Sequence, residues 1–415
     1  MIISNLKLIL AGDWLQGPYV YALYDSYKMS SHQIDILFVA GFGSSMLFGT
    51  IIGSFADKYG RKKNAILYGI LYGLSCLTKH FNNFWILMIG RLLGGMATSI
   101  LYSAFEAWLV YENNKRGYDV DLLGSIFSHA IFGNSIAAIL SGLVAQTAVD
   151  KFGFVSPFDI AFCILVIMII VVSLTWTENF GDTSTSLVSS YGNAYNSIKK
   201  DHKIICLGLI QSLFEGAMYT FVLKWTPSLE NAAKETITEH AGKIPHGFIF
   251  AGFMIAIMIG SSLFKILSKS LQPENFMRGV LCISSICMTI PVLFPDSQTL
   301  IFISFLVFES CVGIFWPSMS TMRGKYVPES TRATIMNFFR IPLNLIVVII
   351  LTQDLTNSTL FKFCTIFLGL TAVAQHWLYR LSVAKVTEVL NSNEEKDGLK
   401  QGDKELPIQS NISEA

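Results

Sequence analysis

The stretch GSFADKYGRKK at residues 53–63 separates two apolar runs, at about residues 35–55 and 64–79. Each run is about long enough to cross a bilayer, because a membrane-spanning helix needs roughly 20 residues. A connection this short forces the two predicted helices to be antiparallel neighbours. We expect Gly53 and Gly60 to allow the tight reversal, since glycine adopts backbone conformations that other residues avoid.

The charged residues of this stretch indicate its side of the membrane. Asp57 can accept a hydrogen bond from a basic partner or from a helix N-terminus. Arg61, Lys62 and Lys63 should hold the loop on the cytoplasmic side. Glu106, at the cytoplasmic end of a later apolar run, falls close to where Arg61 is expected. We therefore predict a gate clamp between Arg61 and either Glu106 or Asp57 that holds a closed state.

The composition places the chain among polytopic helical membrane proteins. Of its 415 residues, 52% are hydrophobic and 14% are charged, which is too apolar for an ordinary soluble domain. The seven cysteines lie in apolar runs without Cys-x-x-Cys spacing, so we expect small buried side chains and no metal site. The sequence contains neither His-Glu-x-x-His nor Gly-x-Ser-x-Gly, and no pattern predicts an enzyme or a cofactor.

Apolar runs of membrane length recur along the chain and predict an all-α fold with twelve transmembrane helices. We expect two pseudo-symmetric six-helix bundles, at residues 1–176 and 204–383. The polar segment 177–203 would form the cytoplasmic linker, and the charged segment 384–415 a disordered cytoplasmic tail. The predicted spans are about residues 3–24, 35–55, 64–79, 84–110, 123–149, 157–176, 204–226, 247–267, 277–294, 299–321, 332–352 and 360–382.

Basic residues set the predicted orientation. If the N-terminus is inside, the cytoplasmic loops hold fifteen Lys and Arg residues, Arg323 among them, and the opposite loops hold five. This positive-inside bias predicts that both termini face the cytosol. The plasma membrane is the expected location, and an organelle membrane is the alternative.

The two halves repeat two short patterns. An acidic residue followed by aromatic residues occurs at Asp13 in span 1 and at Glu215 in span 7. A charged residue four positions before a glycine occurs at Arg91 in span 4 and at Glu309 in span 10. Such a repeat fits a transporter built from related halves, whose solute site lies near mid-membrane between them.

Five charged side chains fall deep within predicted spans: Asp13, Arg91, Glu215, Glu309 and Arg340. A charge at a helix centre costs about 2.5–3.5 kcal/mol on insertion scales, so these groups should face the bundle interior. We expect them to line a hydrated route for a solute. The alternative is that they form ion pairs whose task is to hold helices together.

Other residues in the spans could complete a solute site or bend the helices. Pro18, Pro317 and Pro342 should interrupt their helices and free backbone groups there. Lys224, near the outer end of span 7, is expected to reach the membrane interface with its stem buried. The neutral candidates for solute binding are Gln16, Tyr19, Asn134, Gln211 and Asn337, with Trp14 as a further donor.

Two levels of resemblance follow from these motifs. The pattern Gly-x-x-x-Asp-Lys-x-Gly-Arg-Lys-Lys at residues 53–63 resembles the signature loop between helices 2 and 3 of the major facilitator superfamily. Longer strings are similar to a narrower group, the molybdate-anion transporter family (major facilitator superfamily domain-containing protein 5-like). They are DWLQGPY at 13–19, GRLLGG at 90–95, SAFEAW at 103–108, LFE at 213–215, WTP at 225–227, PSMS at 317–320 and NFFRIP at 337–342.

The resemblance implies a twelve-helix transporter that imports molybdate at the plasma membrane. We expect a monomer in the lipid bilayer without a nucleic-acid partner. Molybdate is a tetrahedral dianion, and guanidinium groups match the edge of an oxyanion with two parallel donors, so Arg91 and Arg340 are the expected ligands. Moving two negative charges inward against 100 mV costs about 4.6 kcal/mol. A compensating cation is therefore expected, with Glu215, Glu309 and Asp13 as proton carriers.

Two alternative functions stay open. A proton-coupled facilitator for another small organic anion or solute would share these features, and competition by tungstate and sulfate would separate it from a molybdate transporter. A non-transporting membrane sensor or scaffold on the same fold would need no hydrated charges midway through both halves. Full function after removal of the Arg340 side chain would favour that class.

Overall fold

The computed structural model describes residues 11–101, 108, 111, 112, 115, 120–180, 187–236, 244–328, 332–353 and 355–402, and every regular element in them is a helix. The first half contains η1 Gly17–Tyr19, α2 Val20–Ser26, α3 Ser31–Tyr59, α4 Arg61–Leu77, η2 Thr78–His80, α5 Phe84–Leu101, α7 Val120–Phe152 and α8 Ser156–Thr175. The second half contains α9 Leu187–Lys200, α10 His202–Thr236, α11 His246–Leu267, α12 Pro273–Leu293, α13 Gln298–Tyr326, α14 Arg332–Thr352 and α15 Asn357–Gly402.

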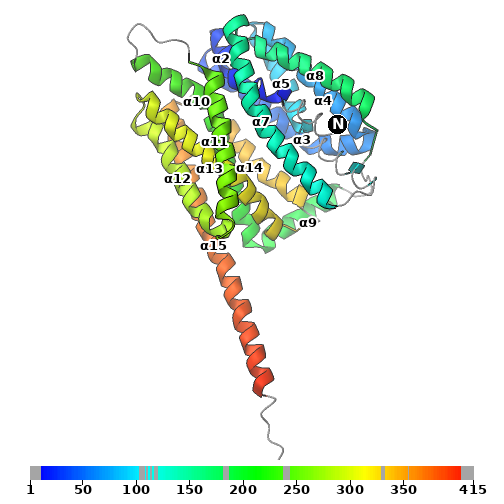
Figure 1. Cartoon of the computed structure of the whole chain (residues 1–415), viewed down its shortest axis with the longest axis vertical. Coiled ribbons are helices and arrows are strands. Elements are labelled where there is room, and N and C mark those ends of the chain that lie inside the picture. The colour runs from blue at the N-terminus through cyan, green and yellow to red at the C-terminus, as the bar shows by residue number, and fades with distance from the viewer. Residues whose placement is uncertain are drawn as a thin grey trace, which may run out of the picture.

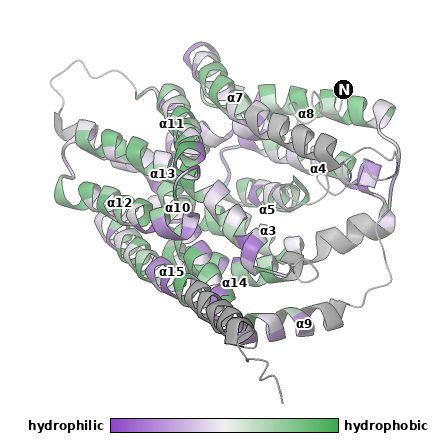
Figure 2. Cartoon of the chain, turned by 60° about the horizontal axis from the view of Figure 1, so that its bottom comes forward, coloured by the Kyte–Doolittle hydropathy of each residue, from purple (hydrophilic) through white to green (hydrophobic). Residues whose placement is uncertain are grey.

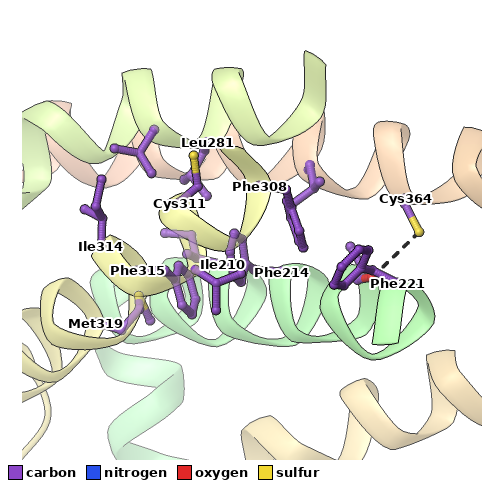
Figure 3. Packing of buried hydrophobic residues seen from close by; sticks show 14 of the residues in the cluster. Ile210, Phe214, Phe221, Leu281, Phe308, Cys311, Ile314, Phe315, Met319 and Cys364 are labelled. Carbon is purple, nitrogen blue, oxygen red and sulfur yellow. Dashed lines mark hydrogen bonds between the residues drawn. The ribbon is translucent and has the colours of Figure 1, made fainter. Parts of the chain in front are cut away.

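Two hydrophobic cores divide these helices into two bundles that lie side by side (Figure 1). In the C-terminal core, the ring of Phe214 on α10 stacks on that of Phe315 on α13, with 3.7 Å between their centroids (Figure 3). The Cys364 thiol of α15 donates to the Ala217 carbonyl of α10 at 3.8 Å (Figure 3). These contacts fix α10 at the centre of the C-terminal bundle, between α13 and α15.

The outward faces of the helices are apolar. Leu140, Ile286 and Leu345 expose 53%, 62% and 55% of their surface, and Figure 2 shows hydrophobic residues in green along most helices of both bundles. Contiguous apolar surface of this kind suits lipid better than water. Among the described residues, the helices long and apolar enough to cross a membrane are Phe84–Leu101, Ser156–Thr175, His202–Ala232, His246–Leu267, Pro273–Leu293, Gln298–Tyr326 and Asn357–Val383.

The turn between α3 and α4 is tighter than the sequence predicts. α3 continues through Gly53 to Tyr59, so the prediction that Gly53 takes part in the reversal is wrong. Gly60 makes the turn with φ 111°, in a region that disfavours other residues. Glu178, which follows α8, accepts a hydrogen bond from Lys62 N at 2.8 Å. A Cβ at position 60 would overlap the Glu178 carboxylate, so the glycine also makes room for this contact.

The prolines have different effects in the two bundles. Pro317 and Pro342 lie inside α13 and α14, which continue past them, so the prediction that they interrupt these helices is wrong. A membrane helix tolerates the missing hydrogen bond where neighbouring groups satisfy the freed carbonyl. Pro18 does mark a break, because the 3-10 segment η1 forms around it before α2 begins.

Two segments predicted to be irregular contain helices. α9 lies within the predicted linker 177–203. α15 continues beyond the bundle to Gly402 (Figure 1), which corrects the prediction that the chain is disordered from residue 384. Residues 384–397 contain neither proline nor glycine, so no helix breaker ends α15 where its apolar part ends.

The repeated glycine has the same task in both bundles. Gly95 of α5 lies directly against the Gly41 carbonyl of α3, and Gly313 of α13 lies against the Ile257 carbonyl of α11. Neither position has space for a Cβ. The charge-then-glycine pattern of the sequence therefore marks two equivalent helix crossings, α3 with α5 and α11 with α13.

A buried ion pair joins the two bundles at the end of the molecule opposite the Gly60 turn. Lys224 of α10 donates to both carboxylate oxygens of Asp35 on α3, at 2.7 and 2.8 Å. The two side chains are only 2% and 10% exposed. The prediction that Lys224 reaches the membrane interface is therefore wrong, because the side chain points between the bundles.

A second contact at the same end brings α7 and α11 together. Gln146 of α7 accepts hydrogen bonds from the Tyr19 hydroxyl at 2.7 Å and from Gly247 N of α11 at 2.9 Å. One turn earlier on α7, a Cβ added to Gly142 would lie 2.9 Å from the Gly247 carbonyl. The two helices therefore meet main chain against main chain.

Replacing Gly60 with alanine should destabilise the protein, because the forced backbone conformation costs about 1–3 kcal/mol and the new Cβ displaces Glu178. Gly153→Ala is the matched control, since Gly153 has φ 88° but no atom within 4 Å of an added Cβ. Thermal unfolding in detergent should show the larger loss for Gly60→Ala. The difference should shrink in a Glu178→Ala background, and equal losses for the two glycines would contradict the overlap.

Breaking the ion pair between the bundles should also lower stability. Asp35→Asn or Lys224→Met alone should cost about 3–5 kcal/mol, because each leaves a buried charge without its partner. The double variant should lose less than the sum of the two. Asp159→Asn serves as the control, since the pair of Asp159 and His80 is half exposed and should contribute about 0–1 kcal/mol. An unchanged unfolding temperature for Asp35→Asn would show that the pair does not hold the bundles together.

Candidate functional site

A cluster of polar side chains gathers in the C-terminal bundle. α10 supplies Gln211 and Glu215, one helical turn apart and 6% and 4% exposed. Arg323, near the end of α13, donates to Gln211 Oε1 at 3.0 Å and to Ser320 Oγ at 3.1 Å. Arg340 of α14 is exposed, and its charge acts on Glu215. Three helices thus contribute to this cluster, and the Ser212 hydroxyl of α10 donates to the Phe339 carbonyl of α14 at 2.8 Å, which places the start of Arg340 beside α10.

Glu215 is the buried acid of this cluster. Its Oε1 atom has no hydrogen-bond partner among the described residues. Gln211 lies one turn before it on α10, and the positive charges of Arg340 and Arg323 both act on it. A carboxylate in this position can be neutralised either by a proton or by the neighbouring cations. Coupling of proton transport to anion transport requires a carboxylate of this kind, which can be neutralised in either of these two ways.

Glu309 is a second buried acid of the same bundle and is 4% exposed, as Glu215 is. It belongs to α13, next to the core residue Phe308 and one turn before Gly313. No hydrogen bond or ion pair of its carboxylate is found in the part of the chain that the structure describes. Glu309 therefore stands apart from the Glu215 cluster, and nothing among the described contacts makes it a helix-locking partner.

Arg91 lies between two helices of the N-terminal bundle. Its Nε donates to the Leu37 carbonyl of α3 at 3.2 Å, and its guanidinium lies 4.7 Å from the ring centre of Phe38. A Cβ at Gly41 would come within 2.7 Å of Nη2. In this conformation the Arg91 guanidinium is therefore packed on the main chain of α3. It belongs to the N-terminal bundle, whereas Arg340 belongs to the C-terminal one.

The other candidates near the N-terminus form separate contacts. Asp13 accepts a hydrogen bond from the Tyr72 hydroxyl at 2.6 Å, which connects the first helical segment to α4. Trp14 Nε1 donates to Asn134 Oδ1 of α7 at 2.7 Å. Gln16 donates to the Gly12 carbonyl within its own segment at 3.1 Å. Tyr19 belongs to the contact between the bundles described above.

The predicted gate is only partly described. Glu106 lies outside the described residues, and for Gly53, Asp57 and Asn337 only the backbone is described. Arg61 N donates to the Asn179 carbonyl at 3.0 Å. The segment that follows α8, which provides Asn179 and Glu178, is thus a partner of this loop that the sequence analysis did not include.

Other residues of this segment fasten it to the N-terminal bundle. The indole rings of Trp108 and Trp176 stack with 3.8 Å between centroids, and Trp108 Nε1 donates to the Thr177 carbonyl at 2.9 Å. The Thr177 hydroxyl donates to Glu112 Oε1 at 2.8 Å. The chain that leaves α8 is therefore held in place before the linker helix α9 begins.

Two basic residues that the sequence assigns to loops make side-chain contacts within the bundles instead. Arg323 was counted among the cytoplasmic loop charges, although α13 continues past it to Tyr326. Lys79, one of the five basic residues that the sequence assigns to the opposite loops, is 1% exposed and donates to the Tyr24 hydroxyl at 2.6 Å. One feature of the sequence could have indicated the Arg323 contact. Arg323 follows Ser320 by three residues, and this spacing puts both side chains on one face of the same helix.

Comparison with known proteins agrees with this architecture. Residues 1–312 match the model of a family described as sugar transporters with 12 transmembrane segments. The chain is 34% identical to the molybdate-anion transporter of Xenopus laevis over 352 residues, which cover 81% of this chain and 74% of the relative. It is 33% identical to that of Xenopus tropicalis, over 86% of this chain and 80% of the relative.

Solved transporters share the fold at low sequence identity. The peptide transporter PepTSo superposes with a TM-score of 0.72 at 9% identity, over 91% of this chain and 97% of its own. The D-xylose–proton symporter gives 0.69 at 11% identity, over 90% and 97%. The described helices form the same pair of bundles, and the relatives are transporters. The chain is thus a membrane transporter of the major facilitator superfamily and belongs to the molybdate-anion transporter family.

Proposed function

We propose that this chain imports molybdate, or a tetrahedral oxyanion of the same charge, across the plasma membrane, with both termini in the cytosol. Relatives that are 34% and 33% identical are named molybdate-anion transporters. The observation that carries the proposal is positive charge held within the C-terminal bundle: Arg323 donates to the buried Gln211 at 3.0 Å, one helical turn from the buried Glu215, on which the charge of Arg340 also acts. An anion that crosses the membrane needs such charge to replace its hydration.

The same charge favours an anion over a neutral sugar, although the matching family model is described as one of sugar transporters. A sugar is recognised by neutral donors and acceptors, and a guanidinium close to a buried carboxylate adds desolvation cost without a matching charge on the ligand. A small organic anion is the second candidate. It would bind to the same arginines, but tetrahedral oxyanions would not displace it efficiently.

Transport would proceed by alternating access of the two bundles. The ion pair of Asp35 and Lys224 and the contact of Gly142 with Gly247 join the bundles at the end that the positive-inside bias assigns to the outside. A state closed on the outside is one of the two that alternating access requires. When the outside opens, Asp35 and Lys224 would separate.

Arg340 and Arg91 would have different tasks in this cycle. Arg340 is exposed, with its charge acting on Glu215, and would contact the anion. Arg91 is bound to the Leu37 carbonyl and would hold α3 against α5 in the conformation described here. Asp13, Glu215 and Glu309 remain the candidates for proton coupling, which would offset the cost of about 4.6 kcal/mol for a dianion moved against 100 mV.

Uptake of labelled molybdate into cells that express the chain tests the function. The unlabelled tetrahedral dianions tungstate and sulfate should compete with the label. Arg340→Ala should abolish most uptake while the unfolding temperature of the purified protein stays unchanged, whereas Arg91→Ala should lower both. No uptake above that of cells without the protein would overturn the proposal, and full uptake by Arg340→Ala would favour a scaffold on the same fold.

Proton coupling predicts that acidification of the outside increases uptake. The initial rate should rise as external pH falls from about 8 to 5.5, because protonated carboxylates carry the compensating charge. Glu215→Gln and Glu309→Gln should each be compared with Glu230→Gln, which removes an acid near the outer end of α10. Loss of the pH response in Glu215→Gln or Glu309→Gln, but not in Glu230→Gln, is the expected result. A rate independent of external pH in the unmodified protein would exclude this coupling.

A further inference from the structure

We propose that His246 is a positioning residue for the contact between the two bundles, and that a proton bound to its imidazole from the outside favours the state in which the outer end is open. The proposal rests on the alternating access proposed above and goes beyond it, because it names the residue that makes opening respond to acid. It gives a role to a buried side chain that neither solute binding nor the ion pair of Asp35 and Lys224 uses.

His246 lies where the two bundles meet. It is the first residue of α11 and directly precedes Gly247, at the place where α11 packs against α7 (Figure 1). Its side chain is only 7% exposed. The ring of Tyr19, from the N-terminal bundle, meets the imidazole edge-on at 5.9 Å between centroids, and the ring of Trp225 of α10 lies at 5.8 Å. Aromatic rings from both bundles therefore enclose the imidazole.

The two nitrogens of the His246 ring have different surroundings. Nε2 lies 3.2 Å from Glu230 Oε1 of α10. Nδ1 is buried and has no hydrogen-bond partner among the described residues. An imidazole with one proton keeps it on the nitrogen that faces a carboxylate, because the neighbour of a ring nitrogen decides which of the two is protonated. Nδ1 is therefore the nitrogen that receives a second proton.

The closed outer end disfavours this second proton. Glu230 and His246 both belong to the C-terminal bundle, so their ion pair stays the same when the bundles separate. A protonated Nδ1 in the closed state is a charged donor without an acceptor, which costs more than a neutral nitrogen in the same position. Separation of the bundles would remove Tyr19 from the imidazole and admit water as an acceptor. Acid should therefore shift the molecule toward the open state.

The other charged groups around the imidazole do not provide the missing acceptor. On α10 the neighbouring carboxylate is that of Glu230, which lies at Nε2. On α7, Asp150 accepts from Gln146 Nε2 at 2.9 Å, and Gln146 Oε1 accepts from the Tyr19 hydroxyl. α13, which also packs along α11, has no charged residue from Gln298 to Phe308. The imidazole is thus the side chain of this group that ordinarily changes charge between about pH 5 and 8.

The experiment measures how fast a membrane-impermeant thiol reagent labels Ser228→Cys in the full chain in liposomes, without substrate. Ser228 is 7% exposed and follows Lys224 by four residues, so both side chains lie on the face of α10 that meets the N-terminal bundle. The reagent should reach residue 228 when the outer end opens. Mass spectrometry distinguishes this label from labels on the native cysteines. The exposed Asn82, between η2 and α5, provides the reference variant Asn82→Cys, which corrects for the effect of pH on the thiol itself.

The labelling rate of Ser228→Cys relative to Asn82→Cys should rise about 5-fold or more from pH 7.5 to 5.5, the ratio that corresponds to one buried donor without a partner. His246→Gln, which cannot gain a charge, should give the same relative rate at both pH values. His80→Gln is the matched control and should keep the full response, because His80 is a half-exposed histidine that pairs with Asp159.

Two results would overturn the role of His246. One is a relative rate that is zero, constant or lower at pH 5.5 when His246 is present. The other is an equal rise in His246→Gln with an unchanged unfolding temperature, which would assign the response to another group. Because the labelling is done without substrate, a failure here leaves the import of molybdate untouched, and absence of molybdate uptake would leave the labelling result unaffected.

Discussion

A charged side chain inside an apolar helix bundle needs a partner, and the structure depends on this constraint. Lys224 meets this need with Asp35 from the other bundle, and Arg91 meets it with a main-chain carbonyl of α3. Both solutions also connect two helices, so the groups that are costly to bury determine which helices lie together. Glu215 meets the same need less completely, since one of its oxygens has no hydrogen-bond partner among the described residues. This difference is what distinguishes a candidate site from a structural contact.

Much of the architecture could be predicted from the sequence because it is encoded locally. The apolar runs gave the membrane-length helices, and the short basic connection gave the antiparallel pair α3 and α4. The pattern of a charge followed by a glycine identified equivalent crossings in the two bundles, since Gly95 and Gly313 both pack against a neighbouring main-chain carbonyl. The predictions failed where a proline, which usually ends a helix, lies inside one. Pro317 and Pro342 lie within α13 and α14, which both continue past them.

The candidate site was harder to predict because its partners are distant in the sequence. Asp35 and Lys224 are separated by 189 positions, and Arg323 and Gln211 by 112. A single sequence indicates how deep a charge lies in its own helix but not which helix faces it. Lys224 was therefore assigned to the membrane interface and Arg323 to a loop. Glu215 and Arg340 are identified from the sequence because their depth within their own helices is unusual for charged residues.

The contact between Gly142 and Gly247 has a consequence for how far this end of the molecule can close. With no side chain on either residue, two helices from different bundles approach until their backbones touch. A larger residue at either position would separate the two helices by an amount that depends on the size of its side chain. The closest approach of the two bundles at this end is thus set by two absent methyl groups, and a larger side chain at either position would keep the two backbones apart.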